Sequence, residues 1–174
     1  MFIKKNVFYF LFIFVFLFSG GLVGQTKDAP EINCTHDAKT FRCVEYVRNY
    51  DADTITVNIP GTHPLLGKNA QVRVFGIDTP EIRTKDKCEK KLAREGKYVV
   101  RRMLKKAKVI HLINVKKGKY FRILADVLID GVSLSKFLLK NNYGYRYLGK
   151  KKKVVNWCGF RVRPKKRIQV EQKW

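Results

Sequence analysis

Short runs of alternating β-branched and aromatic residues set the strongest limit on the fold of this 174-residue chain. Runs of this kind form strands that bury one face. The sequence predicts five of them, bounded by turn residues, at 41–47, 54–59, 70–77, 109–115 and 123–129. Residues 60–69, between the second and third runs, are too long for a tight hairpin, and we expect an exposed loop there.

Helical periodicity appears after the third run and again after the fifth. Residues 86–107 place apolar side chains on one face and Lys and Arg on the other, with Asp86 as N-cap and Glu89 completing a capping box. Residues 134–139 predict a second, short helix. This order predicts an α+β, mainly β fold: a five-stranded barrel of the oligonucleotide-binding (OB) type, with the long helix and the short helix packed outside.

The first residues have the layout of a secretory signal peptide. Lys4 and Lys5 precede an uncharged apolar run at 7–18, and small residues follow it. The run is shorter than the roughly 20 residues of a transmembrane helix, although an uncleaved membrane anchor is the alternative. We therefore expect an exported protein, secreted, periplasmic or at the cell surface. The predicted organisation is a signal peptide at 1–24, a linker at 25–33, one domain at 34–159 and a basic tail at 160–174.

The exported part is strongly basic. Without Lys4 and Lys5, the 37 Lys and Arg residues fall to 35 against 14 acidic residues, an excess of 21 positive charges. A field of this sign concentrates polyanions, which include nucleic acid, anionic glycans and acidic membrane surfaces. The alternative is a solvated basic surface without a polyanionic partner.

Four cysteines, an even number, predict two disulfides in an oxidising compartment. Three pairings are possible. Cys34 and Cys43 bracket a turn-like segment, so the simplest pairing joins them and leaves Cys88 to Cys158. A zinc site is the competing use, but the sequence has no Cys-x-x-Cys pair and its histidines are scattered.

Acidic residues flank two of the predicted strands. Asp51 and Asp53 open the second strand, and Asp78 and Glu81 follow the end of the third. If these strands are antiparallel neighbours, Asp53 and Asp78 converge and offer hard oxygen ligands of the kind that Ca²⁺ or Mg²⁺ prefers. The alternative is that Asp51 and Asp53 only form an Asx turn.

Two arginines add a phosphate-binding element to these acids. Arg73 lies on the third strand and Arg122 directly before the fifth. Guanidinium groups can clamp the oxygens of a phosphodiester transition state, and a carboxylate such as Glu81 can take a proton from the attacking water. For each arginine alone, a structural ion pair is the alternative.

Three segments together resemble the signature segments of the thermonuclease family, also called staphylococcal nuclease. They are Asp51-Ala-Asp-Thr54, Arg73-x-x-x-x-Asp78-Thr-Pro-Glu81 and Gly118-Lys-Tyr-Phe-Arg122-Ile-Leu-Ala125, in the order and spacing of the family. The resemblance implies an OB-fold barrel that hydrolyses DNA and RNA with Ca²⁺. Water attacks the phosphorus, and the products carry 3′-phosphate ends.

The resemblance also implies roles for individual residues. Asp53 and Asp78 would bind calcium, with Thr79 giving its backbone carbonyl and Asp51 assisting through water. Glu81 would be the general base, and Arg73 and Arg122 would clamp the phosphate. Lys119 and Tyr120 would hold a terminal phosphate. The nucleotide-stacking tyrosine corresponds to Tyr145 or Tyr147, of which we select Tyr147.

The chain departs from the family pattern at Ala52, where the family usually has glycine. If this position needs a positive φ, alanine costs roughly 1 kcal/mol and displaces Asp53, so we expect weakened calcium binding at worst. Beyond Tyr143 the resemblance ends in a basic segment that contains Cys158.

The residues and the resemblance together predict a monomeric, calcium-dependent endonuclease that cuts DNA and RNA and has no stable protein partner. The alternative is a non-catalytic protein that binds nucleic acid or another polyanion on the same barrel. Acidic residues in a phosphate-binding groove repel the ligand, so their presence favours chemistry over binding alone.

Overall fold

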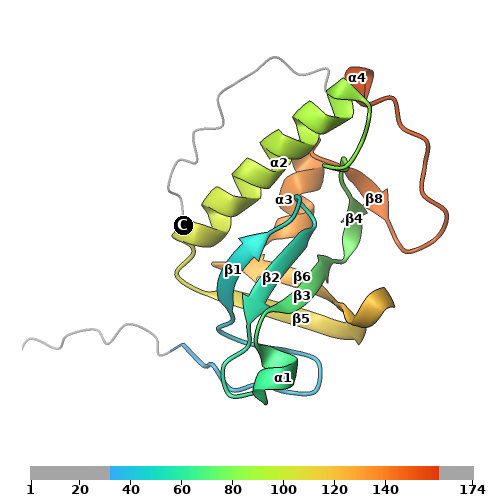
Figure 1. Cartoon of the computed structure of the whole chain (residues 1–174). Helices are drawn as coiled ribbons and strands as arrows, with labels where there is room; N and C mark the ends of the chain where they lie inside the picture. Colours follow the sequence, from blue (N-terminus) through green and yellow to red (C-terminus); the bar gives the residue numbers. More distant parts are fainter. Residues whose placement is uncertain (1–31, 161–174) are drawn as a thin grey trace, which may run out of the picture. The chain divides into compact units, whose positions relative to one another are not determined.

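A computed structural model describes residues 32–160, and its helices and strands all lie in the unit that begins at Asn33 (Figure 1). The predicted signal peptide, the linker up to residue 31 and the basic tail from residue 161 lie outside the described residues. Within the described part, the structure has no helix whose length and apolar character would let it cross a membrane.

The described chain forms the predicted OB-like fold, built on a curled sheet. Neighbouring strands follow the order β1-β2-β3-β6-β5, and β7 pairs with β6 outside this path. The strands are β1 Glu45–Asn49, β2 Thr54–Asn58, β3 Ala70–Val74, β5 Ile110–Lys117, β6 Ile123–Ile129 and β7 Val132–Ser133. β3 and β6 are parallel, and the other pairs are antiparallel. The five-stranded path and the mainly β class are therefore confirmed.

The first predicted strand, 41–47, is divided in the structure. Cys43 has φ +53°, which breaks the strand. Before the break, Phe41 exchanges two backbone hydrogen bonds with Leu112 of β5, each 2.8 Å long. After it, β1 pairs with β2. One chain segment thus contacts both β2 and β5, and the two ends of the curled sheet meet there. Alternation of residues alone does not indicate such a bend.

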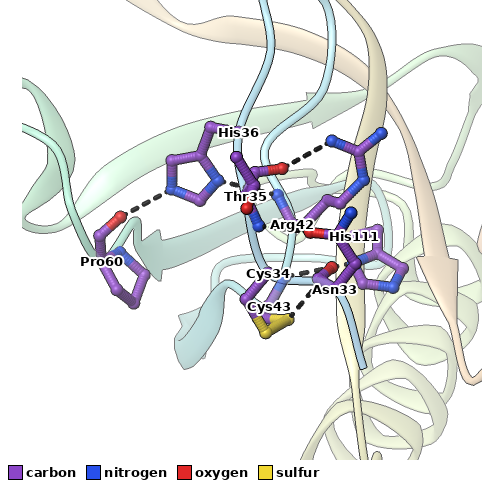
Figure 2. Close-up of a disulfide and its surroundings, with 8 residues drawn as sticks. All are labelled: Asn33, Cys34, Thr35, His36, Arg42, Cys43, Pro60 and His111. Carbon is purple, nitrogen blue, oxygen red and sulfur yellow. Dashed lines mark hydrogen bonds between the residues drawn. A yellow bond between two sulfur atoms is a disulfide. The ribbon is translucent and has the colours of Figure 1, made fainter. Parts of the chain in front are cut away.

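A disulfide between Cys34 and Cys43 closes the hairpin that precedes this bend (Figure 2). The ring of His36 hydrogen-bonds the carbonyl oxygen of Pro60 at 2.6 Å, and the backbone N–H of Cys43 donates to Nδ1 of His111 on β5 at 3.1 Å. These bonds attach the hairpin to two different parts of the barrel.

The third predicted strand, 70–77, is also divided. Gly76 adopts φ +84°, and β3 ends at Val74. The short strand β4, Gly76–Asp78, then leaves the main sheet and pairs with β8, Tyr145–Tyr147, which the sequence did not predict. The break matters because unbroken alternation would put Arg73 and Asp78 on opposite faces of one strand.

Helices pack around the barrel as predicted. The long helix α2, Lys87–Lys106, runs across β1, and α3, Leu134–Lys140, packs on β4 and β6 (Figure 1). Asp86 caps α2 by accepting from the N–H groups of Cys88 and Glu89. The predicted loop at 60–69 contains a one-turn helix, α1 Pro64–Gly67, and the basic turn after β5 contains the 3₁₀ turn η1, Lys119–Phe121.

The last described element is α4, Trp157–Phe160, which the sequence did not predict. It lies against α2, where Cys158 forms a disulfide with Cys88. Both disulfides therefore follow the predicted pairing. Because all four cysteines are used in this way, the alternative of a cysteine-ligated zinc ion has no thiolate to use.

Candidate active site

The predicted acidic residues meet where β2 begins and β4 ends. Thr54 pairs with Arg73, and the N–H of Val74 donates to the carbonyl oxygen of Asp53 at 2.8 Å. The antiparallel pairing of β2 and β3 therefore places Asp53 beside the end of β3. The break at Gly76 then turns β4 so that Asp78 approaches the same place.

Arg73 joins the two predicted metal ligands. Its Nη1 forms an ion pair with Oδ1 of Asp53, and its Nη2 lies 2.6 Å from Oδ1 of Asp78. The same Nη2 donates to the carbonyl oxygen of Ile77 at 3.3 Å. The sequence-based alternative of a structural ion pair is thus realised for Arg73, and the guanidinium is held in a fixed place between the carboxylates.

Asp53 is fully buried and has partners for both carboxylate oxygens. Its Oδ2 accepts from the N–H of Thr79 at 2.9 Å and from the Thr79 hydroxyl at 2.8 Å. A buried carboxylate without such partners would cost several kcal/mol, on the order of a lost ion pair. These bonds fix the loop after β4 against the start of β2.

Asp51 forms the predicted Asx turn. Its Oδ1 accepts from the N–H groups of Asp53 at 3.0 Å and Thr54 at 2.7 Å. Burial raises the pKa of Asp51 to about 6, and the charge of Glu81 acts in the same direction, against Arg73 and the hydrogen bonds from Thr54. Asp51 thus shapes the turn that presents Asp53.

Ala52 lies inside this turn. It is buried, and it is not among the described residues with positive φ. The condition on which the sequence predicted strain is therefore not met, and the structure gives no backbone reason for a displaced Asp53. Instead, the Ala52 methyl group faces α2, where a Cβ added to Gly96 would lie only 3.1 Å from it.

Glu81 lies at the open side of the cluster, with 47% of its side chain exposed. Its backbone N–H donates to Oε1 of Glu89 at 3.0 Å, and the other oxygen of Glu89 accepts from the Thr84 hydroxyl at 2.6 Å. The predicted capping box is therefore only half formed. Asp86 caps the helix, but the Glu89 carboxylate accepts hydrogen bonds from Glu81 and Thr84 and not from the N–H of Asp86.

Two residues that the sequence did not assign to the site bind Asp78. The Tyr145 hydroxyl donates to Oδ2 of Asp78 at 2.8 Å, and Nζ of Lys152 lies 3.1 Å from Oδ1. Burial, followed by the hydrogen bond to Asp78, raises the pKa of Tyr145 to about 12. The resemblance offers Tyr145 only as a candidate for nucleotide stacking, and Lys152 is one of four consecutive lysines that no spacing rule distinguishes.

Lys152 also contacts Glu81, with 2.9 Å between its Nζ and Oε1. Burial alone would lower the pKa of Lys152, but its hydrogen bonds to Glu81 and Asp78 outweigh burial and raise it. The cations of Arg73 and Lys152 thus bridge three carboxylates. Arg73 joins Asp53 to Asp78, and Lys152 joins Asp78 to Glu81.

The other predicted site residues form no hydrogen bond or ion pair with these carboxylates in the described structure. The parallel register pairs Arg73 with Leu124, so Arg122 falls on the same face of the sheet, two residues earlier. Its guanidinium lies 5.8 Å from the ring centroid of Tyr120, which is 84% exposed in η1 beside Lys119. Tyr147 on β8 donates its hydroxyl to the carbonyl oxygen of Lys150 at 2.7 Å.

The donor set suits a hard divalent cation, because carboxylate and carbonyl oxygens are its ligands. Among residues 32–160, one group of three His, Cys, Asp or Glu residues has ligand atoms within 4.8 Å of one another. It consists of Asp86, Cys88 and Cys158, and its two cysteines form a disulfide. Asp53, Asp78 and Glu81 are instead connected pairwise through Arg73 and Lys152.

OB-like barrels commonly bind oligonucleotides or oligosaccharides, and arginines at the edge of such a barrel can bind phosphate groups. Comparison with known proteins identifies the family: residues 71–156 match the family described as staphylococcal nuclease homologue. This match covers just under half of the chain, and it confirms the resemblance seen in the sequence. Nuclease-type function, nucleic acid as substrate and use of a metal ion are typical of the family.

One relative is an uncharacterized protein of Bacillus anthracis, 29% identical over 96 residues. The alignment covers 54% of this chain and 42% of the relative, so the chain matches less than half of that protein's length. The family match includes Arg73, Asp78, Glu81 and Arg122, and it begins after Asp51 and Asp53.

Proposed function

We propose that this protein is an exported, calcium-dependent endonuclease that hydrolyses phosphodiester bonds of both DNA and RNA and leaves 3′-phosphate ends. The supporting observation is the place of its few acidic residues. In a chain with a formal charge of +23, Asp51, Asp53, Asp78 and Glu81 gather at one edge of the barrel, and three of them are buried. Binding a polyanion requires none of them.

The chain's own residues divide the work of the reaction. Asp53, Asp78 and the Thr79 carbonyl would hold calcium, and Asp51 would assist through water. When bound, the ion supplies positive charge that neutralises the phosphate. Glu81 is the group that accepts a proton from the attacking water, and its half-exposed carboxylate is open to solvent.

The two arginines bind and orient the phosphate. The carboxylates of Asp53 and Asp78 fix Arg73 before substrate arrives, so little side-chain freedom remains to be lost. Arg122 has no such carboxylate partner among the described residues, and its guanidinium is available for the phosphate and the leaving oxygen. Lys119 and Tyr120 hold a terminal phosphate, and Tyr147 stacks on a base.

Export is supported by the covalent structure. Two disulfides join the described chain, and such bonds persist outside the reducing cytosol. The apolar N-terminal run of the sequence supports the same location.

The deciding experiment is digestion of single-stranded and double-stranded DNA and of RNA, with Ca²⁺ and with a chelator. We expect cleavage of all three with Ca²⁺ only, and products that a polymerase extends only after phosphatase treatment. Glu81→Gln and Arg122→Ala should each lower the rate by 100-fold or more, the order typical of a lost catalytic group.

Two exposed residues of β1 provide matched controls. Glu45→Gln and Arg48→Ala remove the same charges outside the site and should leave the rate within about twofold. No cleavage with any divalent cation would disprove the enzyme. Cleavage that survives the Glu81→Gln, Arg122→Ala double substitution would disprove the assigned site.

The rival function is non-catalytic binding of nucleic acid. The observation that favours it is the turn η1, where Tyr120 and Phe121 are exposed beside Lys119 and invite base stacking. Binding without cleavage in the digestion experiment, lost on Tyr120→Ala, would establish this function instead.

A further inference from the structure

Lys152 occupies a place in this site that neither the sequence nor the family resemblance predicts. Its Nζ lies 3.1 Å from Oδ1 of Asp78 and 2.9 Å from Oε1 of Glu81. Asp78 is a predicted calcium ligand, and Glu81 is the predicted base. The ammonium group therefore lies between two carboxylates that the proposed reaction needs free.

The segment that carries Lys152, residues 148–156, is held near both of its ends, and we call it the strap. Toward β8, the Tyr147 hydroxyl donates to the carbonyl oxygen of Lys150, and the N–H of Lys153 donates to the Tyr145 hydroxyl at 3.2 Å. Beyond the strap, Cys158 is joined to Cys88 at the start of α2. These attachments keep the lysine close to the carboxylates.

We propose that Lys152 is a built-in competitor of the divalent cation: the strap delivers its ammonium group to Asp78 and Glu81, and a divalent cation must displace it to bind. This inference rests on the proposed function, because it requires the cation to bind Asp78. Oδ2 of Asp78 already accepts from Tyr145, and Oδ1 is shared by Arg73 and Lys152. Arg73 is also held by Asp53 and by the carbonyl oxygen of Ile77, whereas the Lys152 side chain is half exposed. Lys152 is therefore the partner that a cation on Oδ1 would displace.

Competition of this kind lowers the apparent affinity by the fraction of time in which the site is open. If Lys152 occupies the carboxylates about four-fifths of the time, its removal raises affinity about fivefold. The Lys152→Met substitution keeps most of the length of the side chain and removes the ammonium group, with its charge and its hydrogen bonds. Lys151→Met is the matched control, since Lys151 is the exposed neighbour and the same global charge is lost.

The experiment is calorimetric titration of wild-type protein, Lys152→Met and Lys151→Met with CaCl₂. We expect Lys152→Met to bind calcium about fivefold more tightly than Lys151→Met. Equal affinities for the two variants, or weaker binding by Lys152→Met, would overturn the inference and leave the calcium site intact. If no variant binds calcium, the proposed metal site fails, and the inference fails with it.

Chemical labelling gives a second readout that does not depend on activity. Calcium should increase the acylation of Lys152 by an amine-directed reagent, measured by peptide mass spectrometry, because the displaced ammonium group becomes free. Acylation of Lys151 should not change. Calcium binding without increased labelling of Lys152 would show that the two cations do not compete.

Discussion

At the scale of single residues, Asp51 combines burial with two hydrogen bonds to the backbone. Its folded pKa of about 6 lies above the value of about 3.9 for an unfolded chain, so the folded state binds the proton more tightly. The contribution of Asp51 to stability is therefore fully present below about pH 4, and it is lost as pH rises through 6.

We predict that Asp51→Asn stabilises the calcium-free protein by roughly 2 to 3 kcal/mol at pH 8 and by about half as much at pH 5. The amide oxygen of Asn can still accept from Asp53 and Thr54, so the turn survives. The measurement is urea unfolding at both pH values. Glu45→Gln, an exposed acid, should show no such difference, and a pH-independent effect of Asp51→Asn would contradict the raised pKa.

Some contacts of the site could be predicted from the sequence, and others could not. The meeting of Asp53 and Asp78 followed from strand pairing, because antiparallel neighbours bring the start of one strand to the end of the next. The contacts of Tyr145 and Lys152 with Asp78 did not, since they join residues 67 or more positions apart through β8 and the strap. Local pattern contains no signal for such contacts.

At the scale of elements, the packing of α2 against the turn between β1 and β2 depends on one pair of small residues. Gly96 lies opposite the Ala52 methyl group, and its missing side chain leaves the room for that methyl. The Asx turn of Asp51 holds Ala52 on both sides, so the turn cannot easily retreat.

We therefore predict that Gly96→Ala destabilises the protein by about 1 kcal/mol, although alanine favours a helix by a similar amount. In an Ala52→Gly background, the same substitution should instead stabilise by up to about 1 kcal/mol, because the clash is absent. A double-mutant cycle from urea unfolding measures this coupling. Additive effects would show that the two residues do not compete for space.

Element boundaries were predicted well where periodicity was continuous and poorly where a single residue changed direction. β6 and α2 appear within one residue of their predicted bounds. The strands that were predicted at 41–47 and 70–77 break at Cys43 and Gly76, both with positive φ. Cysteine rarely adopts this conformation, and its presence there depends on the disulfide hairpin and on pairing with β5, which are tertiary effects.

At the scale of the whole molecule, the two disulfides close loops of very different length. Cys34 and Cys43 are 9 residues apart, and Cys88 and Cys158 are 70 apart. In the chain-entropy account, the longer loop contributes on the order of 4 kcal/mol and the shorter one on the order of 3 kcal/mol. We predict that Cys88→Ser, Cys158→Ser lowers the free energy of unfolding more than Cys34→Ser, Cys43→Ser does.

Denaturant unfolding of the two double variants, each with the other disulfide intact, tests this order. A larger loss for the short loop would contradict the entropic explanation and would indicate that the hairpin contacts of His36 and Cys43 matter more than loop closure. The sequence predicted the pairing but not where the bridges attach, because the positions of α4 and of the hairpin on the barrel depend on packing.

The pairing of β4 with β8 has a consequence for where along the chain the site is completed. The barrel strands β1, β2, β3, β5 and β6 find their sheet partners within residues 41–129. Asp78, by contrast, receives the Tyr145 and Lys152 contacts from residues that follow all of these strands in the chain. A chain that ended before residue 145 would thus contain every sheet partner of the barrel strands and would lack two of the side chains that bind Asp78.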